Sequence, residues 1–261
     1  MKDRPSLGSR TDGPNLLGGE TTHGVTVDLP ATDTAADWSV QALTALGLGT
    51  RPWFDGGDVV LDLISPGRDL PTARDWDPLR AVGFHACAHP LRMPSTTPGD
   101  DPTEQAARLL DAVPDAGVGY LAARWSEDPD IRATMADLPR AELSFNYVGA
   151  LLNTDTGRDD TTLFAVTDQL GPAGNEEADR YHLVAVVFEH DGEQGVFTWK
   201  YDPRAVDEDA VRSVAKETAA HFERLVRGPD KGGAATVGMS LAEVNTMLAN
   251  LTRERNTEGP R

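Results

Sequence analysis

The chain has 261 residues, of which 42 are acidic and 24 are basic, so its formal net charge is −18. This charge repels phosphate backbones and anionic membrane surfaces, and we therefore expect no nucleic acid or membrane partner. A single cysteine, Cys87, excludes an internal disulfide and fits a reducing compartment. No apolar run has the length of a membrane span or a signal peptide, so we expect a cytoplasmic protein.

The first half of the chain predicts an irregular leader followed by strands and helices. Residues 1–22 are rich in glycine and proline and show no periodic pattern. Alternating or continuous apolar residues predict strands at 24–29, 59–64 and 82–93. Apolar residues at helical spacing predict helices at 38–48 and 103–113, the second capped by Asp101 or Thr103.

The second half continues the same mixture. A helix is expected at 129–138, stopped by Pro139, and a longer one at 207–227 with Asp207 as its N-cap. Strands are expected at 142–147, 163–166, 181–189 and 196–201, with a hairpin turn at 191–195. A capping box at Ser240 begins a short final helix. Strands interspersed with helices predict an α/β layered domain.

Several short motifs occur in a fixed order along the chain. They are Val60-Leu61-Asp62-Leu63 followed by Gly67-Arg68-Asp69, then Arg80-Ala81-Val82-Gly83-Phe84, Gly117-Val118-Gly119-Tyr120 and Phe145-Asn146-Tyr147-Val148-Gly149. In this order and spacing they resemble the late motifs of the condensation and epimerization domains of nonribosomal peptide synthetases. The resemblance covers residues from about Thr22 to about Leu251.

This resemblance implies a fold and a domain plan. The fold would be a single lobe, the C-terminal one, of the chloramphenicol-acetyltransferase-like condensation fold, with a mixed β-sheet flanked by helices. The lobe would occupy residues 23–253, after the irregular leader at 1–22 and before a disordered tail at 254–261.

Two departures from the family bear on catalysis. The family's His-His-x-x-x-Asp-Gly motif is absent, since the chain has no adjacent histidine pair. The proton-transferring glutamate of epimerization domains is replaced by Ile64, and the histidine of the same motif by Pro66. An isoleucine cannot take or give a proton, so a two-base epimerization mechanism is unavailable to this lobe.

The resemblance also implies a substrate cleft. Its candidate residues are Arg68, Arg80, Phe84, Tyr120, Asn146 and Tyr147. Asn146 and Tyr147 match residues that border the family's reaction centre, so we expect them to position a substrate. Tyr120 is equally compatible with an aromatic core position, and Arg68 with a surface ion pair.

His85, Cys87 and His89 alternate along the strand expected at 82–93 and would share one face. Two imidazoles and a thiolate are a reasonable ligand set for zinc or copper. The same alternation is produced by any half-buried strand, and no fourth ligand is evident, so the structural interpretation is favoured. We therefore expect no metal and no cofactor. We assign no residue firmly to catalysis, and the candidates for a catalytic role are Asn146, Tyr147, His85 and His89.

The leading hypothesis is a stand-alone or split C-terminal lobe that serves nonribosomal peptide biosynthesis and needs a partner for catalysis. That partner would be an N-terminal condensation lobe, a synthetase module or carrier protein, or a second copy of the chain. The alternative is a small repurposed enzyme that uses a cleft with His85, Cys87, His89, Asn146 and Tyr147 on the same scaffold.

Overall fold

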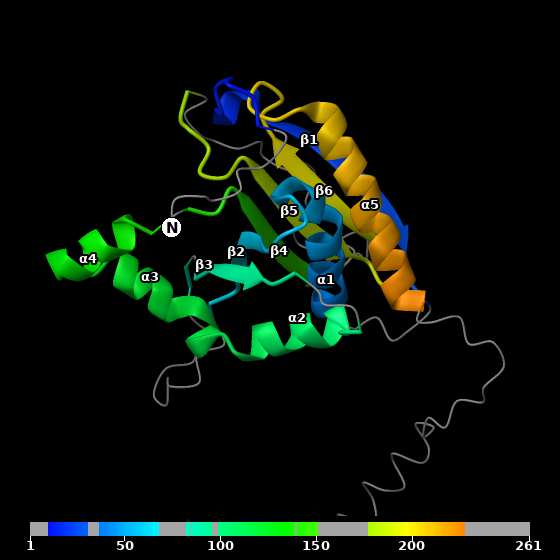
Figure 1. The fold of residues 1–261 in the computed structure, drawn as a ribbon, viewed down its shortest axis with the longest axis horizontal. Helices are drawn as coiled ribbons and strands as arrows, with labels where there is room; N and C mark the ends of the chain where they lie inside the picture. Colours follow the sequence, from blue (N-terminus) through cyan, green and yellow to red (C-terminus); the bar gives the residue numbers. More distant parts are fainter. Residues whose placement is uncertain are drawn as a thin grey trace, which may run out of the picture. The chain divides into compact units, whose positions relative to one another are not determined.

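The computed structural model describes residues 10–30, 37–67, 82–83, 85–95, 99–138, 140–150 and 177–227, apart from the side chain of Ala116. These residues form one mixed sheet of six strands in the order β1-β6-β5-β4-β2-β3 (Figure 1). The predicted α/β class, with helices flanking a mixed sheet, is confirmed.

The strand bounds follow the apolar patterns closely. They are β1 Thr21–Asp28, β2 Val59–Ser65, β3 Cys87–Met93, β4 Leu143–Ala150, β5 Val184–His190 and β6 Gln194–Tyr201. The central strand β4 runs parallel to β2 and β5, and the other pairs are antiparallel. The predicted β5–β6 hairpin is confirmed, and Asp191 tightens its turn by accepting from the backbone N–H of Glu193 and Gln194.

The helices also lie where apolar spacing predicts them, with one addition. They are α1 Ser39–Thr50, α2 Pro102–Asp111, α3 Val118–Arg124, α4 Pro129–Ala136 and α5 Glu208–Arg227, with short 3₁₀ helices η1 Leu17–Gly19, η2 Arg51–Phe54 and η4 Pro114–Gly117. Asp101, rather than Thr103, caps α2. Asp207 caps α5 by accepting from the backbone N–H of Ala210. The η4–α3 pair was not predicted.

Helices α1 and α5 pack side by side over one face of the sheet (Figure 1). Beneath them lies an aromatic cluster in which the ring centroid of Phe188 is 4.5 Å from Phe197 and 5.0 Å from Phe222. Gly49 permits the close approach of the two helices, because a Cβ at that position would overlap Thr218 of α5. The hydrophobic core is therefore concentrated on this face, which is called the covered face below.

The predicted leader is joined to the rest of the described structure. Arg10 forms a β-bridge with Val206, and Leu16 forms one with Asp179. The buried carboxylate of Asp202 accepts from the Leu16 backbone N–H at 3.0 Å and from the Arg204 Nε at 2.9 Å. These hydrogen bonds, chiefly the one from Arg204, hold the pKa of Asp202 well below its ordinary range.

Three expectations need comment. Strand β1 begins at Thr21, because Thr21 and Thr22 continue the ladder with β6, so the last two residues of the predicted leader are not irregular. Strand β3 begins at Cys87 rather than Val82, which is fully exposed. The strand expected at 163–166, the helix expected at Ser240 and the predicted tail lie outside the described residues. Within the residues searched, no helix is long and apolar enough to cross a membrane.

Candidate functional site

The two principal motifs lie on neighbouring parallel strands, β2 and β4. Their register pairs Leu61 with Leu143 at one end and Ile64 with Asn146 at the other. Ile64, which stands where the resembling family has its glutamate, therefore lies directly beside Asn146. Alternation along a strand places both side chains on the face of the sheet opposite α1 and α5, called the open face below.

On the open face, Ile64 and Asn146 belong to a row that crosses the sheet. Cross-strand partners continue it from β3 to β6 as Ala88, Ile64, Asn146, Val187 and Thr198. All five side chains are half-buried. The side-chain amide of Asn146 has no hydrogen-bond partner within the part of the chain that the structure describes. It can therefore donate to and accept from a group placed over this face.

Tyr147 lies on the covered face instead. Its hydroxyl accepts from the backbone N–H of Trp38 at 2.9 Å and lies 3.3 Å from Nε2 of His190. Its ring stacks on Phe188 with centroids 6.0 Å apart, and burial raises the pKa of the hydroxyl. The structure thus places the two adjacent candidates, Asn146 and Tyr147, on opposite faces of the sheet.

Beyond Tyr147, strand β4 contains an irregularity. The register with β5 shifts between Tyr147 and Gly149, so Val148 has no partner in the ladder and is 47% exposed. Gly149 adopts a positive φ of 83°, which a residue with a side chain rarely takes. The Asn-Tyr-Val-Gly motif therefore encodes a bulge that ends the regular strand next to Asn146.

His85, Cys87 and His89, which the sequence offered as an alternative metal ligand set, are not gathered as one. Cys87 and His89 point to the covered side of β3, whereas His85 precedes the strand. The Cys87 thiol lies 3.1 Å from the Ser65 hydroxyl. Across the described ranges, no group of three or more His, Cys, Asp and Glu side chains is arranged to hold a metal ion.

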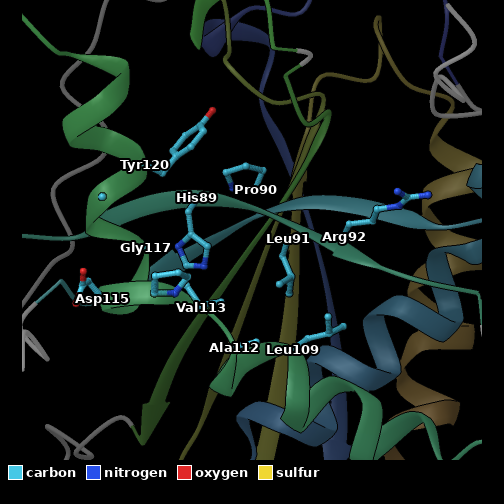
Figure 2. Close-up of a pocket in the computed structure, with 12 residues that line it drawn as sticks. His89, Pro90, Leu91, Arg92, Leu109, Ala112, Val113, Asp115, Gly117 and Tyr120 are labelled. Atoms are coloured by element: carbon cyan, nitrogen blue, oxygen red, sulfur yellow. The ribbon is translucent and has the colours of Figure 1, made fainter. Parts of the chain in front are cut away.

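His89 packs against the segment that carries Gly117 and Tyr120. Figure 2 shows its ring extending from β3 toward η4, beside Gly117. Gly117 has a φ of 84°, and a Cβ there would overlap the imidazole. Burial lowers the pKa of His89, although the charge of Asp62 opposes this shift. His89 and Tyr120 both line a pocket of about 450 Å³.

A buried acid–histidine pair, which we did not predict from the sequence, lies at the open face. Nε2 of His182 lies 2.9 Å from Oδ2 of Asp62, and both side chains are largely buried. Together with Tyr120, Trp125 and Tyr181 they line a second, smaller pocket of about 220 Å³. An aspartate inside the apolar run of β2 was the available signal, but its partner is 120 residues away in the sequence.

The remaining candidates, Arg68, Arg80 and Phe84, lie outside the described residues. Of the predicted site, the structure brings Asn146 beside the substituted Ile64. It places Tyr120 with His89 at a separate pocket and packs the partly buried Tyr147 against the core. It does not gather the five residues of the repurposed-enzyme cleft at one surface.

Comparison with known proteins gives consistent matches. A linear gramicidin synthase of Brevibacillus parabrevis is 25% identical over 225 residues, which is 83% of this chain and 4% of that protein. A chondramide synthase of Chondromyces crocatus is 27% identical over 227 residues, or 82% of this chain and 6% of that protein. No family model matches the chain.

Among solved structures, the epimerization domain from the third module of tyrocidine synthetase B superposes with a TM-score of 0.69 at 20% identity. The match covers 87% of this chain and 52% of that domain. The chain has the fold of about half of an epimerization domain. The X-domain from teicoplanin biosynthesis agrees, with a TM-score of 0.57 at 19% identity over 88% of this chain and 52% of that one.

The predicted relationship to the condensation and epimerization domains of peptide synthetases is thereby confirmed. The chain spans about half the length of the domains it superposes on and a small fraction of the synthetases it matches. The repurposed-enzyme alternative is not favoured, because the relatives are synthetases and the candidate residues do not converge.

Proposed function

We propose that the chain supplies the C-terminal lobe, residues 23–253, of a condensation- or epimerization-type domain in nonribosomal peptide biosynthesis, and that it needs a partner to form a reaction centre. The observation that carries this proposal is the pairing of Ile64 with Asn146 on the open face. An amide lies ready there to orient a substrate, but its neighbour offers no proton-transferring group.

Coverage of the sheet supports the need for a partner. The covered face is buried under α1 and α5, whereas the Ile64–Asn146–Val187 row on the open face is only half-buried. Apolar side chains exposed on such a face favour association with another protein surface, which removes them from water. That second surface is an N-terminal lobe, a synthetase module with its carrier protein, or a second copy of the chain. Only the first two would also supply the missing catalytic histidines, since this chain has no adjacent histidine pair.

Association can be tested on the purified chain. Size-exclusion chromatography with light scattering reports self-association, and a pull-down with the N-terminal half of an epimerization domain reports lobe pairing. We expect Val187→Lys, which places a charge in the open-face row, to weaken the association more than tenfold, since an unpaired charge is costly in an interface.

Ser213→Lys adds the same charge on an exposed position of α5 and serves as the matched control. It should leave both association and thermal stability unchanged. A monomer that captures no synthetase half, or equal behaviour of the two variants, would argue against the proposal.

A further inference from the structure

The pocket of about 450 Å³ lies between β3 and the segment formed by α2, η4 and α3 (Figure 2). Its wall is mainly apolar and includes Leu91, Leu109, Ala112, Val113 and Pro114. A pocket of this volume is in the range that holds small organic molecules. Its lining comes from both sides of the β3 edge and includes none of Ile64, Asn146 and Val187, so it is distinct from the open-face row proposed for lobe pairing.

His89 is the polar group buried in this wall. The residue is 4% exposed, and neither ring nitrogen has a hydrogen-bond partner among the residues described. Buried polar groups are nearly always bonded, and leaving one unpaired destabilises the fold. A neutral imidazole carries one donor and one acceptor, and a hydroxyl or amide group, which can accept or donate, fits either nitrogen in either tautomer.

The position of the ring is compatible with such a ligand. Gly117 fixes one edge of the imidazole, and the pocket lies toward Leu91, Leu109 and Val113. Both ring nitrogens are buried, so binding requires a rotation about Cβ–Cγ, a soft torsion in histidine, that turns one of them toward the pocket.

Charge restricts the ligand further. Asp115 lies in the wall and repels an anion, and Arg92 in the wall is already paired with Asp58. A charged ligand would also lose its hydration in an apolar pocket without a counter-ion. These features favour a neutral molecule.

We propose that this pocket binds a small neutral molecule with an aryl or branched-alkyl body and one hydroxyl or amide group, which bonds the His89 ring. Bound in this way, the molecule joins the β3 edge to the α2–η4–α3 segment. The proposal does not depend on peptide synthesis or on a partner lobe, and it can be tested on the chain alone.

Two probes of matched shape test it, 2-naphthol and 2-fluoronaphthalene, titrated into the isotope-labelled protein and followed by NMR of the Leu91, Leu109 and Val113 methyl groups. We expect 2-naphthol to bind about three- to tenfold more tightly, the value of one net hydrogen bond. In His89→Leu the two probes should bind equally. Equal binding to the unmodified protein, or no shift at these methyl groups, would overturn the proposal.

A second pair of variants covers the case in which His89→Leu folds poorly. Ala112→Trp places a large ring at an exposed position of the pocket wall and should abolish binding of both probes. Asp111→Trp, one residue earlier and outside the wall, should not. The ¹⁵N resonances of the His89 ring should move with 2-naphthol. Resonances that do not respond would show that only water bonds the ring, and would refute the proposal.

Discussion

The two faces of the central sheet differ in how they are completed. The covered face carries Leu61, Phe145, Phe188 and Trp199, all buried beneath α1 and α5. The open face carries Ile64, Asn146 and Val187, all half-buried, together with the buried Asp62–His182 pair. The same strands form both faces. The faces differ because large apolar residues occupy the positions that point to the covered side, and smaller or polar residues occupy many of those that point to the open side.

We expect the covered face to determine the stability of the fold and the open face to carry its function. The apolar side chains of the covered face are buried within one chain by aromatic and aliphatic packing. The open face carries the family motif but lacks the glutamate that the resemblance predicts at residue 64, and it presents an amide with no bonded partner among the described residues. Substitutions on the two faces should therefore have different consequences, even at adjacent positions.

The largest expected effect comes from the pair Phe188→Ala and Val187→Ala. Phe188 is fully buried among Tyr147, Phe197 and Phe222, so its truncation should cost about 3–5 kcal/mol of unfolding free energy. Val187 faces the open side, so its truncation to alanine should cost only about 1 kcal/mol of unfolding free energy. Urea unfolding followed by circular dichroism measures both, and equal losses would show that the open face is covered as well.

The second pair, Gly117→Ala and Gly119→Ala, tests the segment that crosses the β3 edge. Gly117 has a positive φ and would drive its Cβ into the His89 ring, so its substitution should destabilise the protein by about 2 kcal/mol. Gly119 has open space around its Cβ position within α3, so alanine there should stabilise by about 0.5 kcal/mol. Thermal unfolding of the two variants should shift in opposite directions.

The double variant His89→Ala with Gly117→Ala provides the control for this pair. Removing the ring relieves the overlap, so the two substitutions should cost less together than the sum of the single costs. Strict additivity would contradict the contact between His89 and Gly117.

The third pair takes the adjacent motif residues Asn146 and Tyr147. Tyr147→Phe removes the acceptor of the Trp38 backbone N–H and should cost about 1 kcal/mol. Asn146→Ala removes a side chain without bonded partners among the described residues and should change stability by less than about 0.5 kcal/mol. Chemical denaturation resolves the two values, and a reversed order would mean that Asn146 is the structural member of the motif.

Much of the fold follows from the sequence because periodicity reports burial directly. The alternation in β5 and the apolar stripe of α5 predicted both elements to within a few residues. The η4–α3 segment was missed because Gly117 and Gly119 weaken a helical pattern of only 7 residues. Glycine is required at residue 117 because of its tertiary contact with the His89 ring, which no local sequence pattern encodes.

The candidate site was less predictable. Motif matching assigned Asn146 and Tyr147 to one cleft, although neighbouring residues of a strand face opposite ways. The contact between Asp62 and His182 depends on strand order, since β2 and the segment before β5 lie on either side of β4. Strand order is set by long-range packing and cannot be read from spacing along the chain.

The smallest expected effect is the pH dependence due to His89. Burial lowers its pKa below the ordinary value of 6.5, so the unfolded chain binds a proton more readily than the folded one. The stabilising contribution is complete above pH 6.5 and is lost progressively as the pH falls from 6.5 toward the lowered pKa of the folded state. His221 has a pKa lowered by burial and by Arg224, so it contributes in the same direction.

Comparison of the unmodified protein with His89→Leu isolates the His89 share, because His221 is present in both. The charges that face the ring come from several elements: Asp62 of β2 favours its protonation, and Asp115 of η4 and Arg92 of β3 lie in the same pocket wall. We expect the difference in unfolding free energy between the two proteins to shift by less than about 1 kcal/mol between pH 7.5 and 6.0, with the variant relatively more stable at the lower pH. A difference that does not change with pH would mean that the ring is solvated in the folded state, and that the covered side of β3 is open to water.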